Sequence, residues 1–177
     1  MGVFACSDLH GCWQQWEAIQ KFCKDSDRIY VLGDCIDRGS NPIGVLKSVL
    51  ADPRATLICG NHEDMMISFI DAVDGKAKYD PKVEYSPFAY RYLTHWYANG
   101  GGTTHDEMEL LTDDELKNII EYIRCAPLFK ILEYKEKKYL LCHASPPFFA
   151  KWDFLENISN FSKDDFIWER TEREQKI

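Results

Sequence analysis

Two carboxylates and a guanidinium fall close together at Asp34, Asp37 and Arg38, directly after the apolar run 28–32. Two aspartates held side by side at the end of a buried strand repel each other unless a cation lies near them. A pair of metal ions is the simplest source of that positive charge, and the neighbouring arginine would bind an anionic substrate. The stretch therefore predicts a dinuclear metal site that acts on a phosphate ester.

Three further polar clusters in the sequence supply side chains that would complete such a site. Each of them directly follows a short apolar run, as Asp34 does. Carboxylate, imidazole and amide groups together suit manganese, iron or zinc, and they make neither a cysteine zinc cage nor a calcium loop. Cys35 lies beside Asp34, but we interpret its thiol as a small apolar filler rather than a ligand. The side chains that we expect at the site are Asp8, His10, Asp34, Asn61, His62 and His143.

The arrangement of these groups suggests how two ions would be held. If the ions share Asp34 as a bridging carboxylate, Asp8 and His10 complete one side of the site. Asn61 and His143 then hold the other side. A water that bridges the ions would be acidified toward hydroxide at neutral pH and would attack phosphorus in line, without a covalent enzyme intermediate.

Three residues near the predicted ligands have side chains suited to other steps of the reaction. Arg38 would grip the equatorial phosphate oxygens with two parallel hydrogen bonds. His62 is next to a predicted ligand, and we expect it to stay free of the metal and to protonate the leaving oxygen. Asp37 would orient His62 by a hydrogen bond to its other ring nitrogen.

The elements expected to carry these clusters repeat one order three times: a strand, a polar loop and a helix. The strands are predicted at 3–6, 28–32 and 55–59, and apolar residues at helical spacing follow each loop. The first helix should end near Asp25, and the second should begin at Pro42, because proline is favoured in a first turn. Strands that alternate with helices indicate a largely parallel sheet, which binds ligands at the carboxyl ends of its strands.

The rest of the chain is expected to contain a cap, one more helix and a hairpin. Segment 74–104 contains turn residues, an aromatic helical run and a glycine run, and we interpret it as a cap or lid insertion. Residues 112–115 form a capping box that opens a helix. Runs 129–134 and 139–142 predict a hairpin whose second strand leads into His143.

Composition indicates one globular domain with a reduced interior. The chain has 177 residues, of which 45% are hydrophobic, and its net charge of −8 argues against nucleic-acid or membrane-surface binding. Two bound divalent ions would still attract a phosphate. Seven cysteines without a C-x-x-C pair indicate reduced thiols and a cytoplasmic protein. We find neither an apolar run of about 20 residues nor a basic leader before the first strand. The oligomeric state is left open.

Several segments of the sequence resemble the signature blocks of a known family. Ser7 stands where that family usually has glycine, and the likeness extends over nearly the whole chain. The family is that of the calcineurin-like metallophosphoesterases, in the phosphoprotein phosphatase branch and close to the phage lambda type of serine/threonine protein phosphatase. The segments that carry the resemblance are Asp8-Leu9-His10-Gly11, Gly33 to Gly39, Gly60 to Met66, Asn99 to Gly102, Cys142 to Phe148 and Trp168-Glu169-Arg170.

The resemblance implies a fold and a set of roles. The fold would be α/β, with two mixed sheets sandwiched between helices, in a single domain over 1–177 with the cap over 74–104. The cofactor would be two divalent metal ions, with manganese first and iron or zinc as alternatives. The implied residues are the metal ligands Asp8, His10, Asp34, Asn61 and His143, the acid pair Asp37 and His62, and the phosphate contacts Arg38, Arg170 and Asn61.

One part of the family pattern is missing. The family continues to a further strand and a Gly-His pair whose histidine completes the second metal site, whereas this sequence ends at Ile177. His95 and His105 precede the fourth polar cluster and are poor substitutes. We expect that the chain is incomplete at its C-terminus, because the late strands that would cover the sheet edges are absent too. The alternative is a second ion held by three protein ligands and water.

These observations lead to three hypotheses about function. The first is a metallophosphatase that acts on phosphoserine or phosphothreonine proteins or on small phosphoesters. The second keeps the same metals but makes the substrate a dinucleoside polyphosphate such as diadenosine tetraphosphate, because hydrolases of that kind share the motif blocks. The third is a non-catalytic phosphate-binding or scaffold protein. Metal content and a comparison of substrates would separate the three.

Overall fold

The first three strands of the chain form a parallel sheet. The computed structural model describes residues 1–75, 84–146 and 158–169. The strands are β1 (Val3–Cys6), β2 (Arg28–Leu32) and β3 (Ala55–Ile58), in the order β1-β2-β3. Val3 lies opposite Arg28, and Ile29 lies opposite Ala55. All three predicted strands are thus confirmed, and their carboxyl ends meet at one edge of the sheet.

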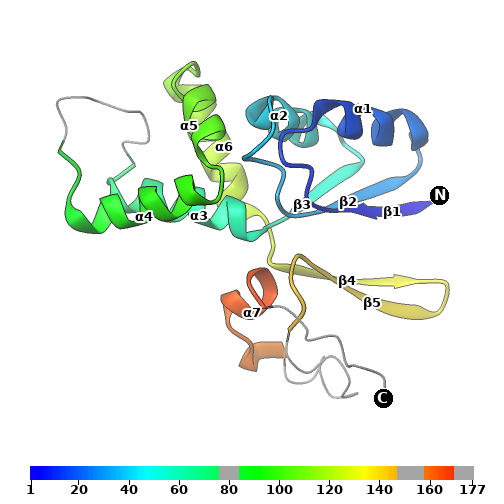
Figure 1. The fold of residues 1–177 in the computed structure, drawn as a ribbon. Helices are drawn as coiled ribbons and strands as arrows, with labels where there is room; N and C mark the ends of the chain where they lie inside the picture. The colour runs from blue at the N-terminus through cyan, green and yellow to red at the C-terminus, as the bar shows by residue number, and fades with distance from the viewer. Residues whose placement is uncertain (76–83, 147–157, 170–177) are drawn as a thin grey trace, which may run out of the picture.

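Two helices cover one face of this sheet (Figure 1). They are α1 (Trp13–Phe22) and α2 (Pro42–Ala51), and Pro42 occupies the first turn of α2 as expected. Trp16 on α1 is fully buried between them, and its indole nitrogen donates to the Ser48 hydroxyl at 2.9 Å. The apolar faces of the two helices therefore form the core on that side of the sheet.

Four helices from the middle of the chain pack beyond β3. They are α3 (Asn61–Ala72), α4 (Pro87–Ala98), α5 (Gly102–Met108) and α6 (Asp113–Cys125). Helix α4 runs along α3, where the rings of Phe69 and Trp96 lie 5.8 Å apart (Figure 1). The predicted capping box at Thr112 and Glu115 is present at the start of α6. Residues 76–83 of the predicted cap lie outside the described residues, and its described part contributes α4 and the start of α5.

The second sheet is an antiparallel hairpin of β4 (Phe129–Tyr134) and β5 (Lys137–Cys142). The prediction that the second strand starts at residue 139 is wrong by two residues. Lys135 and Glu136 alone make the turn, both with positive φ (49° and 63°), and such a two-residue turn matches the twist of paired strands. Lys137 therefore pairs with Tyr134 and extends the strand.

A short helix packs against the end of the hairpin that lies opposite its turn. Helix α7 (Lys163–Ile167) follows a 3-10 turn at Ile158–Asn160, and the ring of Phe166 stacks on that of Phe129 at 4.8 Å. The amide of Ala144 donates to the Phe166 carbonyl at 2.7 Å. These contacts hold the segment after β5 against the rest of the molecule. The α/β fold with two sheets and flanking helices is confirmed.

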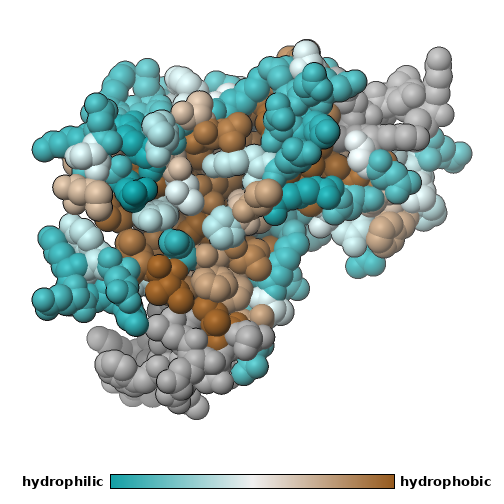
Figure 2. Space-filling view, turned by 180° about the vertical axis from the view of Figure 1, so that it is seen from behind, coloured by the Kyte–Doolittle hydropathy of each residue, from teal (hydrophilic) through white to brown (hydrophobic). Residues whose placement is uncertain are grey.

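Much apolar surface remains on the back of the molecule. Figure 2 shows hydrophobic residues gathered in the middle of that face. None of the described helices combines the length and the hydropathy that crossing a bilayer would need.

The ion pair of Asp52 and Arg54 joins the ends of α1 and α2 to the start of β3. Arg54 donates to both carboxylate oxygens of Asp52, at 2.9 and 2.7 Å, and its other terminal nitrogen donates to the Cys23 carbonyl at 2.8 Å. Gln20 also donates to Asp52, at 2.9 Å. The guanidinium, with smaller contributions from these other donors, holds the pKa of Asp52 below its usual range.

We expect Asp52→Asn to lower the free energy of unfolding at pH 7 by about 1–3 kcal/mol, which is the usual cost of losing hydrogen bonds to a charged group. Because the folded-state pKa of Asp52 lies below its unfolded value of about 3.9, this contribution is present above that value and is lost as pH falls through the folded pKa. Urea unfolding at pH 7 and at about pH 3.5 measures the effect. The exposed Asp106 on α5 provides the control Asp106→Asn. A difference between Asp52→Asn and wild type that grows toward low pH would contradict the assignment.

Candidate metal centre and active site

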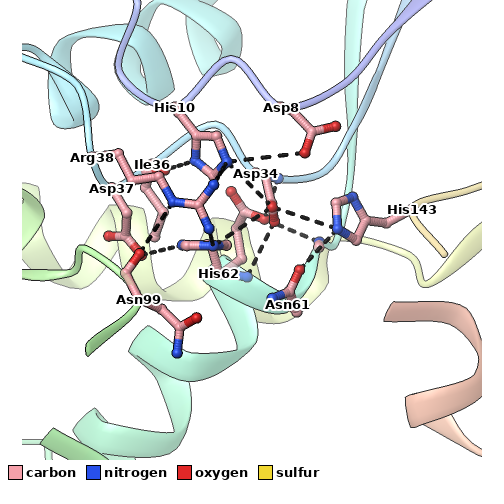
Figure 3. A network of polar contacts seen from close by, with 12 residues as sticks. Asp8, His10, Asp34, Ile36, Asp37, Arg38, Asn61, His62, Asn99 and His143 are labelled. Atoms are coloured by element: carbon pink, nitrogen blue, oxygen red, sulfur yellow. Dashed lines mark hydrogen bonds and ion pairs between the residues drawn. The ribbon is translucent and has the colours of Figure 1, made fainter. Parts of the chain in front are cut away.

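The polar clusters that follow the strands converge at one place. Asp8 follows β1, Asp34 follows β2, Asn61 begins α3 directly after β3, and His143 follows β5 (Figure 3). The loops that follow β1 and β2 stay hydrogen-bonded to each other beyond the ends of the strands, because the amide of His10 donates to the Asp34 carbonyl at 2.8 Å. The expected meeting of four clusters is therefore seen in the described residues.

These loops carry unusual backbone strain. Five residues of the candidate site have positive φ angles, a backbone conformation that residues other than glycine rarely adopt. Each such residue costs on the order of 1–3 kcal/mol and persists only where its surroundings impose it, most often at functional sites. The five residues and their φ angles are Asp8 (56°), His10 (43°), Asp34 (57°), Asp37 (70°) and Arg38 (64°).

Glu63 braces the loop that carries Asp34. Its fully buried carboxylate accepts hydrogen bonds from the backbone amides of Asp34 and Cys35, both at 2.8 Å, and from that of Gly60 at 3.0 Å. Burial, together with the nearby charge of Asp34, raises the pKa of Glu63 above its usual value. Sequence reasoning gave this residue no role, because an acid in the first turn of a helix is common and is usually exposed.

Two glycines let the loops approach this closely. A Cβ atom on Gly60 would lie 2.4 Å from a carboxylate oxygen of Asp34. One on Gly33 would lie 2.5 Å from the Gly60 Cα and 2.8 Å from a ring nitrogen of His143. The space around Asp34 is thus available only because both positions lack a side chain.

Three imidazole rings point at one carboxylate oxygen. The Nε2 atoms of His10, His62 and His143 lie 3.6, 3.8 and 3.5 Å from Oδ2 of Asp34. The side chain of Asp34 is only 4% exposed, and a carboxylate oxygen of Asp8 lies 3.9 Å from Nε2 of His10. Among the described residues, His10, Asp34 and His62 form a group in which one ligand atom from each lies within 4.8 Å of the others.

The tautomers of two of these rings fit a bound cation. Nδ1 of His10 lies 3.0 Å from the Ile36 carbonyl, and Nδ1 of His143 lies 2.8 Å from the Leu32 carbonyl. Carbonyls can only accept, so each neutral ring carries its proton on Nδ1 and directs the lone pair of Nε2 into the site. A backbone carbonyl that fixes the far nitrogen is the usual partner of a metal-binding histidine.

Acceptor atoms therefore face one another at this site. Nε2 of His143 lies 2.9 Å from the amide oxygen of Asn61 and 3.5 Å from Asp34, and none of the three atoms has a proton to share when the ring is neutral. Divalent ions relieve such crowding of lone pairs and negative charge. The residues present thus fit the metal ions that the sequence predicted.

His62 differs from the other two histidines in its partners. Its Nδ1 atom faces a carboxylate, Oδ2 of Asp37, at 2.6 Å, and both side chains are buried. Its Nε2 atom accepts from Arg38 at 3.0 Å and lies 3.8 Å from Asp34. The predicted pair of His62 and Asp37 is therefore in hydrogen-bond contact, and Nε2 of His62 faces the same carboxylate as the two other rings.

Arg38 is an exposed residue that lies over the site (Figure 3). One terminal nitrogen donates to Nε2 of His10 and the other to Nε2 of His62, both at 3.0 Å. The turn between α4 and α5 holds this arginine, because its Nε donates to the Asn99 carbonyl at 3.2 Å and its amide to the Gly100 carbonyl at 3.0 Å. The glycine run of the predicted cap thus serves to place the guanidinium.

The remaining candidates are either outside the described residues or have other contacts. Arg170 falls outside the described residues, as do Pro147 and Phe148 of the fourth signature segment. His105 is buried against Tyr97, whose hydroxyl lies 2.5 Å from Nδ1, and the ring of His95 packs on Trp168 at 5.7 Å. Cys35 is fully buried, and burial raises the pKa of its thiol well above the usual value, which suits an apolar filler. The list of described site residues is Asp8, His10, Asp34, Asp37, Arg38, Asn61, His62 and His143.

Carboxylates, imidazoles and an arginine gathered at the strand ends of a parallel sheet are typical of the metal-dependent hydrolases of phosphate esters. Within that class the chain belongs to one family. The model of the calcineurin-like phosphoesterases matches residues 1–176. The expected family is therefore confirmed.

Two curated relatives carry different names. The chain is 26% identical over 167 residues to a symmetrical bis(5'-nucleosyl)-tetraphosphatase of Wigglesworthia glossinidia brevipalpis, covering 92% of this chain and 51% of that protein. It is also 26% identical over 171 residues to serine/threonine-protein phosphatase 2 of Salmonella typhimurium, covering 95% of this chain and 67% of that protein. The chain spans about half the length of most of the curated relatives it matches.

A solved structure shares the fold. The metallophosphoesterase of Sphaerobacter thermophilus superposes with a TM-score of 0.52 at 17% identity, covering 96% of this chain and 50% of that one. The likeness supports the arrangement of sheets and helices described above.

Proposed function

We propose that the protein containing this chain is a phosphomonoester hydrolase that removes phosphate from phosphoserine and phosphothreonine in proteins. The observation that carries the proposal is the convergence on Asp34. Three imidazole nitrogens lie within 3.8 Å of its Oδ2 atom, and Arg38 lies over two of the rings. Such a site can concentrate positive charge where a phosphate would bind.

Five side chains would hold two divalent ions, of which manganese is our first expectation. When bound, the ions supply positive charge for the phosphate and lower the pKa of water so that it can attack phosphorus. Iron or zinc would suit the same donor atoms. The proposed ligands are Asp8, His10, Asp34, Asn61 and His143.

The remaining residues of the site would bind the substrate and move a proton. Arg38 would exchange its present contacts with His10 and His62 for two phosphate oxygens. His62 carries a proton on Nδ1, held by Asp37, and would give a second proton from Nε2 to the leaving oxygen of the serine or threonine. Asn61 and Arg170 are further proposed contacts of the phosphate.

The second candidate function is hydrolysis of a dinucleoside polyphosphate. The name of the Wigglesworthia relative supports it as strongly as the name of the Salmonella relative supports the first. We place the phosphoprotein first because the glycine run at 99–102, which holds Arg38, is part of the resemblance to the lambda type of phosphatase.

A direct comparison of substrates tests the proposal. The purified protein is loaded with manganese and given a phosphoserine peptide, p-nitrophenyl phosphate and diadenosine tetraphosphate. We expect kcat/KM for the peptide to exceed that for the nucleotide by at least about tenfold, equivalent to about 1.4 kcal/mol. A preference for the nucleotide would replace the first function by the second. Two bound ions per chain without any turnover would favour a phosphate-binding scaffold instead.

We also propose that the protein works in a reducing cytoplasm, without nucleic-acid or membrane partners. All seven cysteines are free thiols. Burial raises the pKa of Cys6 and of Cys142 to about 11, so both stay protonated at neutral pH. The acidic net charge of −8 gives no support for binding to nucleic acid or to an anionic membrane.

A further inference from the structure

Asp37 is contacted by two side chains from helices distant in the sequence. Its carboxylate is fully buried and accepts from the indole nitrogen of Trp96 at 2.8 Å and from the hydroxyl of Thr104 at 2.5 Å. These residues lie 59 and 67 positions from Asp37, on α4 and α5. Together with Nδ1 of His62 at 2.6 Å, they surround the carboxylate with three donors.

The direction of each of these hydrogen bonds is determined. An indole nitrogen can only donate. Thr104 accepts the backbone N–H of Asp37 at 2.8 Å, so its own hydroxyl hydrogen is left to point at Oδ1. Trp96 and His62 both donate to Oδ2. Asp37 is thus held as an acceptor in one orientation, with a single oxygen aimed at the imidazole.

The surroundings of Trp96 are shaped to hold its ring in place. The side chain is fully buried, and it packs on Phe69 at 5.8 Å and on His105 at 5.8 Å between ring centroids. A Cβ atom on Gly101 would lie only 2.4 Å from the indole ring. The glycine therefore leaves the room that brings the indole N–H to Asp37.

We propose that Trp96 and Thr104 are positioning residues for proton transfer by His62, and that they act through Asp37. The proposal rests on the proposed function. With both donors present, Asp37 keeps the imidazole in the orientation that points Nε2 into the site. Without either donor, the carboxylate is free to turn, and His62 no longer meets the leaving oxygen in the geometry that proton transfer requires.

If Trp96 and Thr104 only stabilised the fold, replacing them would affect activity no more than replacing another buried residue of the same type. Trp16 provides that comparison. Trp16 is also fully buried, and its indole also donates, to Ser48 at 2.9 Å, but it lies between α1 and α2. Trp96→Phe and Trp16→Phe each remove one hydrogen bond donated by a buried indole ring and retain an aromatic ring. Thr104→Val removes the hydroxyl with little change in volume.

The first test is the dependence of turnover on the leaving group. For the manganese-loaded protein, we expect Trp96→Phe and Thr104→Val to lower kcat for a phosphoserine peptide by about 10–100-fold, the range of partners that orient reacting groups. The loss should be at most about threefold for p-nitrophenyl phosphate, whose leaving group needs little protonation. KM should change less than about twofold, and Trp16→Phe should lower neither rate. Equal losses for both substrates would overturn the proposal.

A second measurement tests the positioning role without any activity assay. If the wild-type protein shows no turnover, that result counts against the proposed function alone. The His62 Nδ1 proton, bonded to Asp37, should give a low-field proton resonance protected from exchange with water. We expect Trp96→Phe and Thr104→Val to shift or broaden that resonance and Trp16→Phe to leave it unchanged. Retention of an unshifted, protected signal in the first two variants would refute the positioning role.

Discussion

Replacing His62 with asparagine is expected to lower turnover of a phosphoserine peptide by about 10²–10⁴-fold, the range of a lost general acid. The proton for the leaving oxygen comes from Nε2, and an amide has none that it can release. The asparagine amide can still donate to Asp37, which accepts from His62 at 2.6 Å. Metal content should stay at two ions per chain, as measured by elemental analysis of the purified protein.

The exposed His95 on α4 provides the control for this prediction. His95→Asn changes the same chemical group on the surface, where the ring packs on Trp168, and should keep full activity. The loss in His62→Asn should shrink with p-nitrophenyl phosphate, because its leaving group needs little protonation. A variant that loses metal together with activity would instead make His62 a ligand, which its distance of 3.8 Å from Asp34 allows.

The sheet and the meeting of the ligand loops followed from the sequence because their causes are local. Each apolar run is short, each polar cluster follows it directly, and apolar residues at helical spacing come next. Parallel strands bring their carboxyl ends to one edge, so Asp8, Asp34 and Asn61 had to meet there. His143 was found in the same way, because it follows the predicted hairpin.

Contacts between distant segments could not be foreseen in this way. Glu63 has the position of an ordinary first-turn acid, and only the fold shows three backbone amides around it. Trp96 and Thr104 belong to the predicted cap, and nothing in their local pattern indicates a bond to Asp37. The turn of the hairpin was predicted two residues too long, because Lys135 and Glu136 take positive φ without being glycine or asparagine, the usual signals of such a tight turn.

Asp34→Asn is expected to have the second large effect, a loss of metal binding. The substitution removes one negative charge from the point that three imidazole nitrogens approach within 3.8 Å. At least one of the two proposed ions should be lost, and turnover should fall by more than about 10³-fold. This loss exceeds the 10–100-fold typical of residues that only support ligands. Elemental analysis and manganese titration measure the loss directly.

The stability of Asp34→Asn separates loss of metal from loss of fold. In the wild-type protein without metal, Nε2 of His143 faces the oxygens of Asn61 and Asp34, which are both acceptors. The new side-chain amide of the Asp34→Asn variant can donate to this nitrogen, so the metal-free variant should be at least as stable as the wild-type protein. With manganese at 100 times its dissociation constant, the wild-type protein should gain about 2.7 kcal/mol. The variant should gain much less, and Asp106→Asn should behave as wild type does. A variant that bound two ions and was stabilised as fully as the wild-type protein would show that Asp34 does not hold the metals, and the proposed reaction would lose its basis.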